Sequence, residues 1–72
     1  MTYVFVNNDH GVYVVAWSND LYQLIPDLDL APGRYTVYET DLMPDEICKI
    51  DRLIMQGKLK YVTLLTNYVG AE

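Results

Sequence analysis

The 72-residue chain has room for a single domain, residues 1–72, and its 51% hydrophobic content excludes an intrinsically disordered chain. Its only cysteine, Cys48, excludes an internal disulfide, and one cysteine with one histidine cannot supply the four ligands of a structural zinc site. The net charge of −5 is unevenly spread, because residues 1–46 carry −7 and residues 47–72 carry +2.

The first two apolar segments predict a pair of strands. Residues 2–6, "TYVFV", and residues 12–17, "VYVVAW", are rich in β-branched and aromatic side chains, which pack well on a pleated surface. The intervening "NNDHG" contains Asn, Asp and Gly, which tolerate the backbone angles of tight turns. The pattern therefore predicts a β-hairpin with its loop at residues 7–11.

A short helical turn is predicted near residues 19–25, where the apolar residues of "LYQLI" recur at helical spacing. Ser18 or Asn19 is the expected N-cap, because short polar side chains accept a hydrogen bond from a free backbone N–H. Pro26 lacks an N–H and should stop the turn.

The second half of the chain reads as strand, helix and strand. Residues 34–39 alternate in polarity, as expected of a strand. Residues 44–56 carry an apolar stripe at helical spacing, with Pro44 suited to the first helical position and Gly57 to the end. Residues 58–66 are apolar on both faces, which favours an interior strand, while Lys58 and Lys60 at its start are residues that protect an edge.

This order of elements predicts an α+β fold. We expect a three- to four-stranded antiparallel or mixed sheet, with one main helix at about 44–56 packed on one face and a short helical turn near 19–25. Met1 is followed directly by strand-like residues rather than by a basic segment and an apolar run, and no apolar stretch is long enough to span a bilayer. A cytoplasmic location and no membrane partner are therefore expected.

No residue pattern in the chain indicates catalysis or a cofactor. His10 has no accompanying nucleophile motif, and Cys48, on the predicted helix, is interpreted as a small buried apolar residue. Asp27 and Asp29 lack the further ligands of a calcium loop. The chain is therefore expected not to be an enzyme, and to bind no metal and no cofactor.

Tyrosine is the unusual component of the composition. The chain contains seven: Tyr3, Tyr13, Tyr22, Tyr35, Tyr38, Tyr61 and Tyr68. So many phenol hydroxyls are hard to satisfy inside so small a fold, so some rings should lie at the surface. Tyrosine and tryptophan are enriched in protein interfaces, which predicts a binding role.

The expected partner-binding residues come from the hairpin loop and from aromatic side chains. A loop at the end of a rigid hairpin presents polar groups to a partner, and an exposed ring presents a large contact area. The predicted contact residues are Asn7, Asn8, Asp9, His10, Tyr13, Trp17 and Tyr38.

Taken as a whole, with "MTYVFVNNDHGVYVVAW" leading and "MPDEICKIDRLIMQGKLKYV" closing, the chain resembles the small RNA-polymerase-binding transcription regulators of lytic Xanthomonas phages. The resemblance covers most of the chain and rests on size, charge and general pattern. It implies a host-takeover protein in the host cytoplasm that binds bacterial RNA polymerase and inhibits or reprograms transcription, with antitermination as a further implied effect. No direct contact with nucleic acid is implied.

Two other functions fit the sequence. An acidic chain can mimic nucleic acid and inhibit a DNA-binding nuclease or defence protein through its carboxylates. A small nucleic-acid-binding module would instead use the only basic cluster, which consists of Lys49, Arg52, Lys58 and Lys60.

Overall fold

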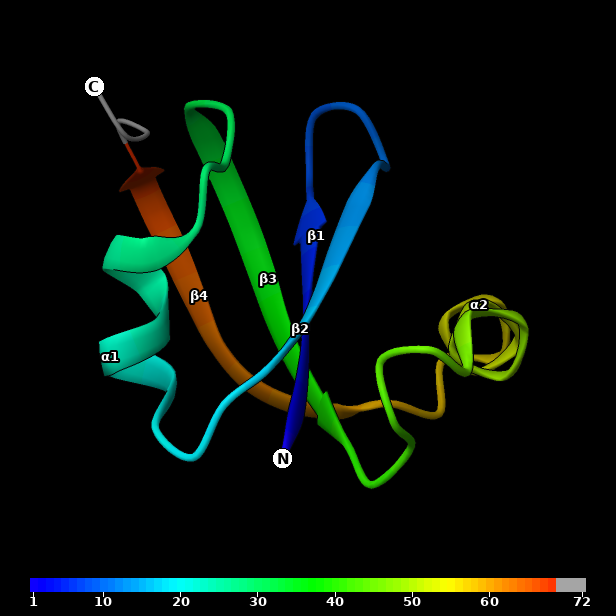
Figure 1. The fold of residues 1–72 in the computed structure, drawn as a ribbon. Helices are drawn as coiled ribbons and strands as arrows, with labels where there is room; N and C mark the ends of the chain where they lie inside the picture. Colours follow the sequence, from blue (N-terminus) through cyan, green and yellow to red (C-terminus); the bar gives the residue numbers. More distant parts are fainter. Residues whose placement is uncertain (69–72) are drawn as a thin grey trace.

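The computed structural model describes residues 1–68 and consists of one four-stranded antiparallel sheet with helices on both faces (Figure 1). The strands are β1 (Thr2–Asn7), β2 (Tyr13–Trp17), β3 (Gly33–Thr40) and β4 (Lys60–Tyr68). Their order across the sheet is β2-β1-β3-β4, so β1 and β3 are central and β2 and β4 form the edges. The α+β prediction is confirmed.

The helical elements lie on opposite sides of the sheet (Figure 1). The main helix is α2 (Ile47–Gln56), and the short turn is α1 (Leu21–Leu24), continued by the 3-10 helix η1 (Ile25–Asp27). Because side chains alternate along a strand, each face of the sheet has its own set of residues. We call these the α1 face and the α2 face after the helix that covers each.

The main core lies between the sheet and the α1–η1 segment. Its buried residues come from β1, β3 and the connection between β2 and β3: Tyr3, Phe5, Leu21, Leu30, Tyr35 and Val37. On the other face, Val4 of β1 and Ile50 of α2 are fully buried. The central strands are therefore covered on both sides, as their apolar sequences require.

Three boundaries differ from the prediction. Asn7 belongs to β1 and Val12 to the loop, so the hairpin loop is residues 8–12 rather than 7–11. The N-cap of α1 is Asp20, not Ser18 or Asn19, since its Oδ1 accepts the N–H of Tyr22 at 2.9 Å. The 3-10 geometry carries the turn past Pro26, because a proline at the start of a helical segment loses no hydrogen bond.

The main helix begins at Ile47, three residues later than predicted. Pro44 lies in a turn instead, in which the N–H of Glu46 donates to the carbonyl of Met43 at 3.0 Å. Proline is as favourable at the second position of a turn as at the first position of a helix. The sequence therefore did not distinguish a turn at Pro44 from a helix that begins there. Gly57 ends the helix in the left-handed conformation, with φ of +65°, as predicted.

The interior position favoured for the last strand was wrong, because β4 is an edge strand, as the lysines at its start allowed. Its apolar residues on one side pack on the core, where Val62 and Leu65 contact the main cluster. On the strand's exposed surface, Tyr61 and Leu64 keep 59% and 46% of their areas accessible. Apolar side chains on both faces are therefore not sufficient to mark an interior strand.

Candidate partner-binding surface

The hairpin loop is shaped by the side chain of Asn7. This side chain is buried, and its Oδ1 accepts hydrogen bonds from the backbone N–H groups of Asp9 (2.9 Å) and His10 (3.1 Å). Asparagine favours such local bonds, which replace the ladder where the strand ends. Gly11 completes the turn with φ of +70°. Asn7 therefore positions the loop rather than presenting a contact group to solvent.

Two further side chains fasten the loop to β3. The Oδ1 of Asn8 accepts the hydroxyl of Thr36 at 2.8 Å, and Asp9 forms an ion pair with Arg34 at 3.3 Å. The start of β3 lies beside the loop, since a Cβ on Gly33 would be in van der Waals contact with Nδ2 of Asn7, at 3.4 Å. Asn8, Asp9 and His10 are all exposed, so the loop is a fixed polar surface.

Tyr13, at the start of β2, points to the α2 face. Its hydroxyl donates to Oδ1 of Asp51 at 3.2 Å. Desolvation raises the pKa of Tyr13, and the hydrogen bond to Asp51 and the charge of that carboxylate raise it further. This half-buried ring joins an edge strand to a helix, so it has a structural role as well as partial exposure.

The other two predicted aromatic residues are separate from the loop. Trp17 lies at the far end of β2, with 50% of its area exposed. Tyr38 is half-buried on the α2 face and packs edge-to-face on Tyr61, with ring centroids 6.4 Å apart. The seven predicted contact residues therefore do not form one patch: three are exposed at the loop, and Trp17 is exposed at the opposite end of β2.

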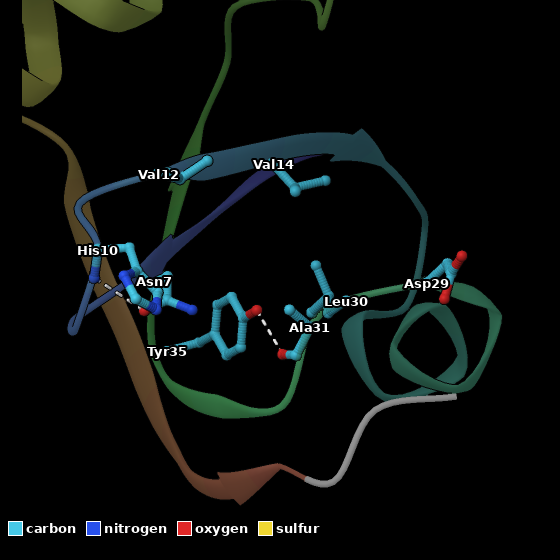
Figure 2. A pocket seen from close by; sticks show the side chains of 8 residues that line it. All are labelled: Asn7, His10, Val12, Val14, Asp29, Leu30, Ala31 and Tyr35. Carbon is cyan, nitrogen blue, oxygen red and sulfur yellow. Dashed lines mark hydrogen bonds between the residues drawn. The ribbon is translucent and has the colours of Figure 1, made fainter. Parts of the chain in front are cut away.

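A cavity of about 240 Å³ lies on the α1 face beside β2, and we call it the β2 groove (Figure 2). Its lining residues are Asn7, His10, Val12, Val14, Asp29, Leu30, Ala31 and Tyr35. The walls are largely apolar, and the Tyr35 hydroxyl donates to the carbonyl of Ala31 rather than into the space. Figure 2 shows His10 and Asn7 at one end and Asp29 at the other.

The groove exists because the α1–η1 segment, which covers this face of the sheet, does not extend over β2. Among the described residues, the main cluster takes its members from β1, β3 and the α1–β3 region, while Val62 and Leu65 of β4 pack against it; β2 contributes none. Val12 and Val14 consequently keep 64% and 38% of their areas exposed. An uncovered apolar strand at the edge of a sheet is the kind of surface at which proteins pair with other chains, so this edge is the candidate binding surface.

Sequence reasoning placed His10 and Asn7 at a binding surface but missed Val12, Val14 and Asp29. The missing information is how far the helical cover extends, because nothing in "VYVVAW" indicates that the α1 face of this strand stays uncovered. The only sequence signal was the absence of any charged residue or proline from a strand that turned out to be an edge.

Surface tyrosines are present, as the composition predicts. Of the six whose side chains the structure describes, Tyr22 and Tyr61 are exposed at 72% and 59%. Tyr3 and Tyr35 are buried, and the remaining two are half-buried. The prediction for Tyr68 lies outside the described side chains.

The other candidate sites carry less chemistry. Cys48 is exposed, contrary to the prediction, since it lies about 200° around the helix from the buried Ile50. Two members of the basic cluster already have carboxylate partners, Lys49 with Glu46 and Lys60 with Glu39, each at 3.1 Å. Within residues 1–68, no group of three or more His, Cys, Asp or Glu side chains is placed to hold a metal ion.

No helix in the described part of the chain combines the length and apolar character needed to cross a membrane. Comparisons of the chain with known protein families, with curated proteins and with solved structures found no match.

Proposed function

We propose that this chain is a non-enzymatic protein that binds bacterial RNA polymerase and inhibits or reprograms transcription. The observation that carries the binding role is the uncovered edge formed by β2 and the loop residue before it: Val14 and Trp17 of β2 expose 38% and 50% of their areas, and Val12 of the loop exposes 64%. The choice of polymerase rests on the resemblance to small phage transcription regulators and on the charge of the chain.

The chemistry of β2 suits a protein partner. Tryptophan is among the residues that contribute most to binding energy when a partner buries it, and its rigid ring loses little entropy. The β2 groove adds an apolar hollow next to the same strand, on the α1 face, whereas Trp17 lies on the α2 face. An apolar centre with a polar edge, here supplied by the hairpin loop, is the usual composition of an interface between proteins.

The charge of the chain supports a partner with basic surfaces. The net charge is −5, and eight of the ten acidic residues lie in residues 1–46, which include β2 and the groove. Enzymes that handle nucleic acid carry clusters of Lys and Arg for the phosphate backbone, and such clusters attract an acidic protein. RNA polymerase is an enzyme of this class.

The proposal is tested with purified bacterial RNA polymerase, as core enzyme and as holoenzyme. We expect the chain to co-elute with the polymerase in size-exclusion chromatography and to change promoter-dependent transcription in vitro. Trp17→Ala should weaken the complex by about tenfold or more. Met55→Ala, on α2 and 82% exposed, is the matched control and should bind as the wild type does.

Failure to co-elute together with unchanged transcription would refute the proposal. The nucleic-acid-mimic alternative predicts a different result: direct competition with DNA, steep loss of affinity with salt, and little effect of Trp17→Ala. A shift of labelled DNA or RNA by the chain alone, at low salt, would favour the nucleic-acid-binding alternative.

A further inference from the structure

The outer edge of β2 carries backbone N–H and C=O groups that another strand could pair with. In an antiparallel pair, the residues of one strand alternate between exchanging hydrogen bonds with the partner and pointing their N–H and C=O groups away from it. The N–H of Asn7 donates to the carbonyl of Val12 at 2.8 Å, and the N–H of Ser18 donates to the carbonyl of Met1 at 3.0 Å. These two bonds show that the even-numbered residues 12 and 18 face β1. With the register Phe5↔Val14, residues 14 and 16 bond to β1.

The backbone groups of Tyr13, Val15 and Trp17 therefore point outward from the sheet. The order β2-β1-β3-β4 leaves them without a neighbouring strand among the described residues. The strand contains no charged residue and no proline, the two usual means by which proteins prevent further pairing at an edge. By contrast, the other edge strand, β4, begins at Lys60, whose side chain is 78% exposed.

A strand added beside β2 would place its side chains in register with those of β2. The residue opposite Val14 would point to the α1 face, directly over the groove, since paired residues share a face. A space of about 150 Å³ is enough for a benzene-sized group. The groove measures about 240 Å³, so it accommodates one large apolar side chain but not a typical small-molecule ligand.

The carboxylate of Asp29, at one end of the groove, favours a basic residue in the bound segment. Asp29 lines the groove at the end opposite His10, and no ion pair joins it to another described residue (Figure 2). Residues two apart in a strand share a face and lie about 7 Å from each other. A Lys or Arg two positions from the apolar residue would therefore extend along the groove toward Asp29.

We propose that the outer edge of β2 binds an extended segment of a partner protein as a fifth strand, with one large apolar side chain in the β2 groove and a Lys or Arg two residues away facing Asp29. The charge of the chain favours a foreign, basic segment over a second copy, because two copies of net charge −5 repel each other. This inference rests on the proposed function only in that both require a protein partner.

The direct test is hydrogen exchange at single amides, with and without the partner. In the free chain we expect slow exchange at Val14 and Ala16, which bond to β1, and fast exchange at Tyr13, Val15 and Trp17. Two probes are used: purified RNA polymerase, and a synthetic nine-residue peptide. In the peptide every second residue is threonine and the residues between are lysine or leucine, so that a leucine and a lysine lie two positions apart. In either complex, the three outward amides should become protected.

Two variants test the contributions of the strand edge and of the groove to binding separately. Val15→Pro removes an outward N–H and leaves the bonds to β1 in place, so it should weaken binding by about tenfold while the hairpin still forms. Val14→Glu places a charge in the groove and should weaken binding by a similar factor. Leu64→Glu, at an exposed apolar position of the other edge strand, is the matched control and should bind as the wild type does.

The outcomes distinguish this inference from the proposed function. If the polymerase binds but residues 13, 15 and 17 stay unprotected and Val15→Pro binds normally, the strand-addition mode is refuted while the function stands. If the peptide protects these amides and the polymerase does not bind at all, the mode stands and the choice of polymerase is refuted. If protection appears in the chain alone as its concentration rises, the occupant is a second copy and the inference is overturned.

Discussion

The hydroxyl of Tyr13 donates to Oδ1 of Asp51 across 3.2 Å and so joins the edge strand β2 to helix α2, 38 residues later in the chain. This bond supports β2 on the α2 face, while its α1 face remains open at the groove. The strand is therefore held in place on one side and available on the other. This arrangement suits a surface that must be rigid before it meets a partner.

Tyr13→Phe should lower the free energy of unfolding by about 0.5 kcal/mol at neutral pH, since the bond is partly exposed. The pKa of Tyr13 is raised in the folded chain, so its contribution is complete below the unfolded pKa of 10.0 and is lost as pH rises through the folded value. Urea unfolding of wild type and variant from about pH 8 to 11 measures the difference. The two stability curves should converge at high pH.

Tyr22→Phe is the control for that experiment, because Tyr22 is 72% exposed. Asp51→Asn should keep an acceptor for the hydroxyl but remove the nearby negative charge, and so bring the pKa of Tyr13 closer to its usual value. Stability curves of wild type and Tyr13→Phe that stay parallel across the whole range would contradict the assignment.

Asn7→Ala should destabilise the chain by about 1–3 kcal/mol, because two backbone N–H groups lose their acceptor inside the turn. Asn8→Ala removes only the bond to Thr36 at the surface and should cost less than about 1 kcal/mol. Urea unfolding gives both values, and the amides of Asp9 and His10 should exchange faster in the first variant alone. Equal effects of the two substitutions would mean that Asn7 does not shape the loop.

The sequence predicted what depends on nearby residues. Gly11 and Gly57 adopt positive φ, the hairpin turns at "NDHG", and α2 carries its apolar stripe inward at Ile50. The position of β4 in the sheet was harder to predict, because β4 pairs with β3 from the far side of the α2 connection. The lysines at its start were the only local sign of an edge, and the apolar residues on both of its faces pointed the other way. The groove was missed because it depends on how far the α1–η1 cover extends over the sheet.

Gly33→Ala should destabilise the chain by about 1–3 kcal/mol, since φ is +149°, a backbone conformation that residues with a Cβ rarely adopt; the new Cβ itself would make ordinary contacts, 3.4 Å from Asn7 Nδ2 and 3.6 Å from Asp9 Oδ2. Gly57→Ala introduces a strained φ of +65° with open space around it, so it should cost about 1 kcal/mol. Amide chemical shifts provide the second readout. Only the Gly33 variant should move the signals of the hairpin loop, because its new Cβ would contact Asn7 and Asp9; unmoved loop signals would contradict this placement of Gly33 beside the loop.

Ile50→Ala should cost about 2–5 kcal/mol, because Ile50 is fully buried between α2 and the sheet and its loss leaves a cavity. Ile47 belongs to the same apolar stripe, but it is the first residue of the helix and is 45% exposed. Ile47→Ala should therefore cost less than about 1 kcal/mol. Urea unfolding of both variants, with the slope of the transition compared, measures the difference. Similar losses at the two positions would mean that α2 packs along its whole length, and that its first turn contacts the sheet more closely than the structure has it.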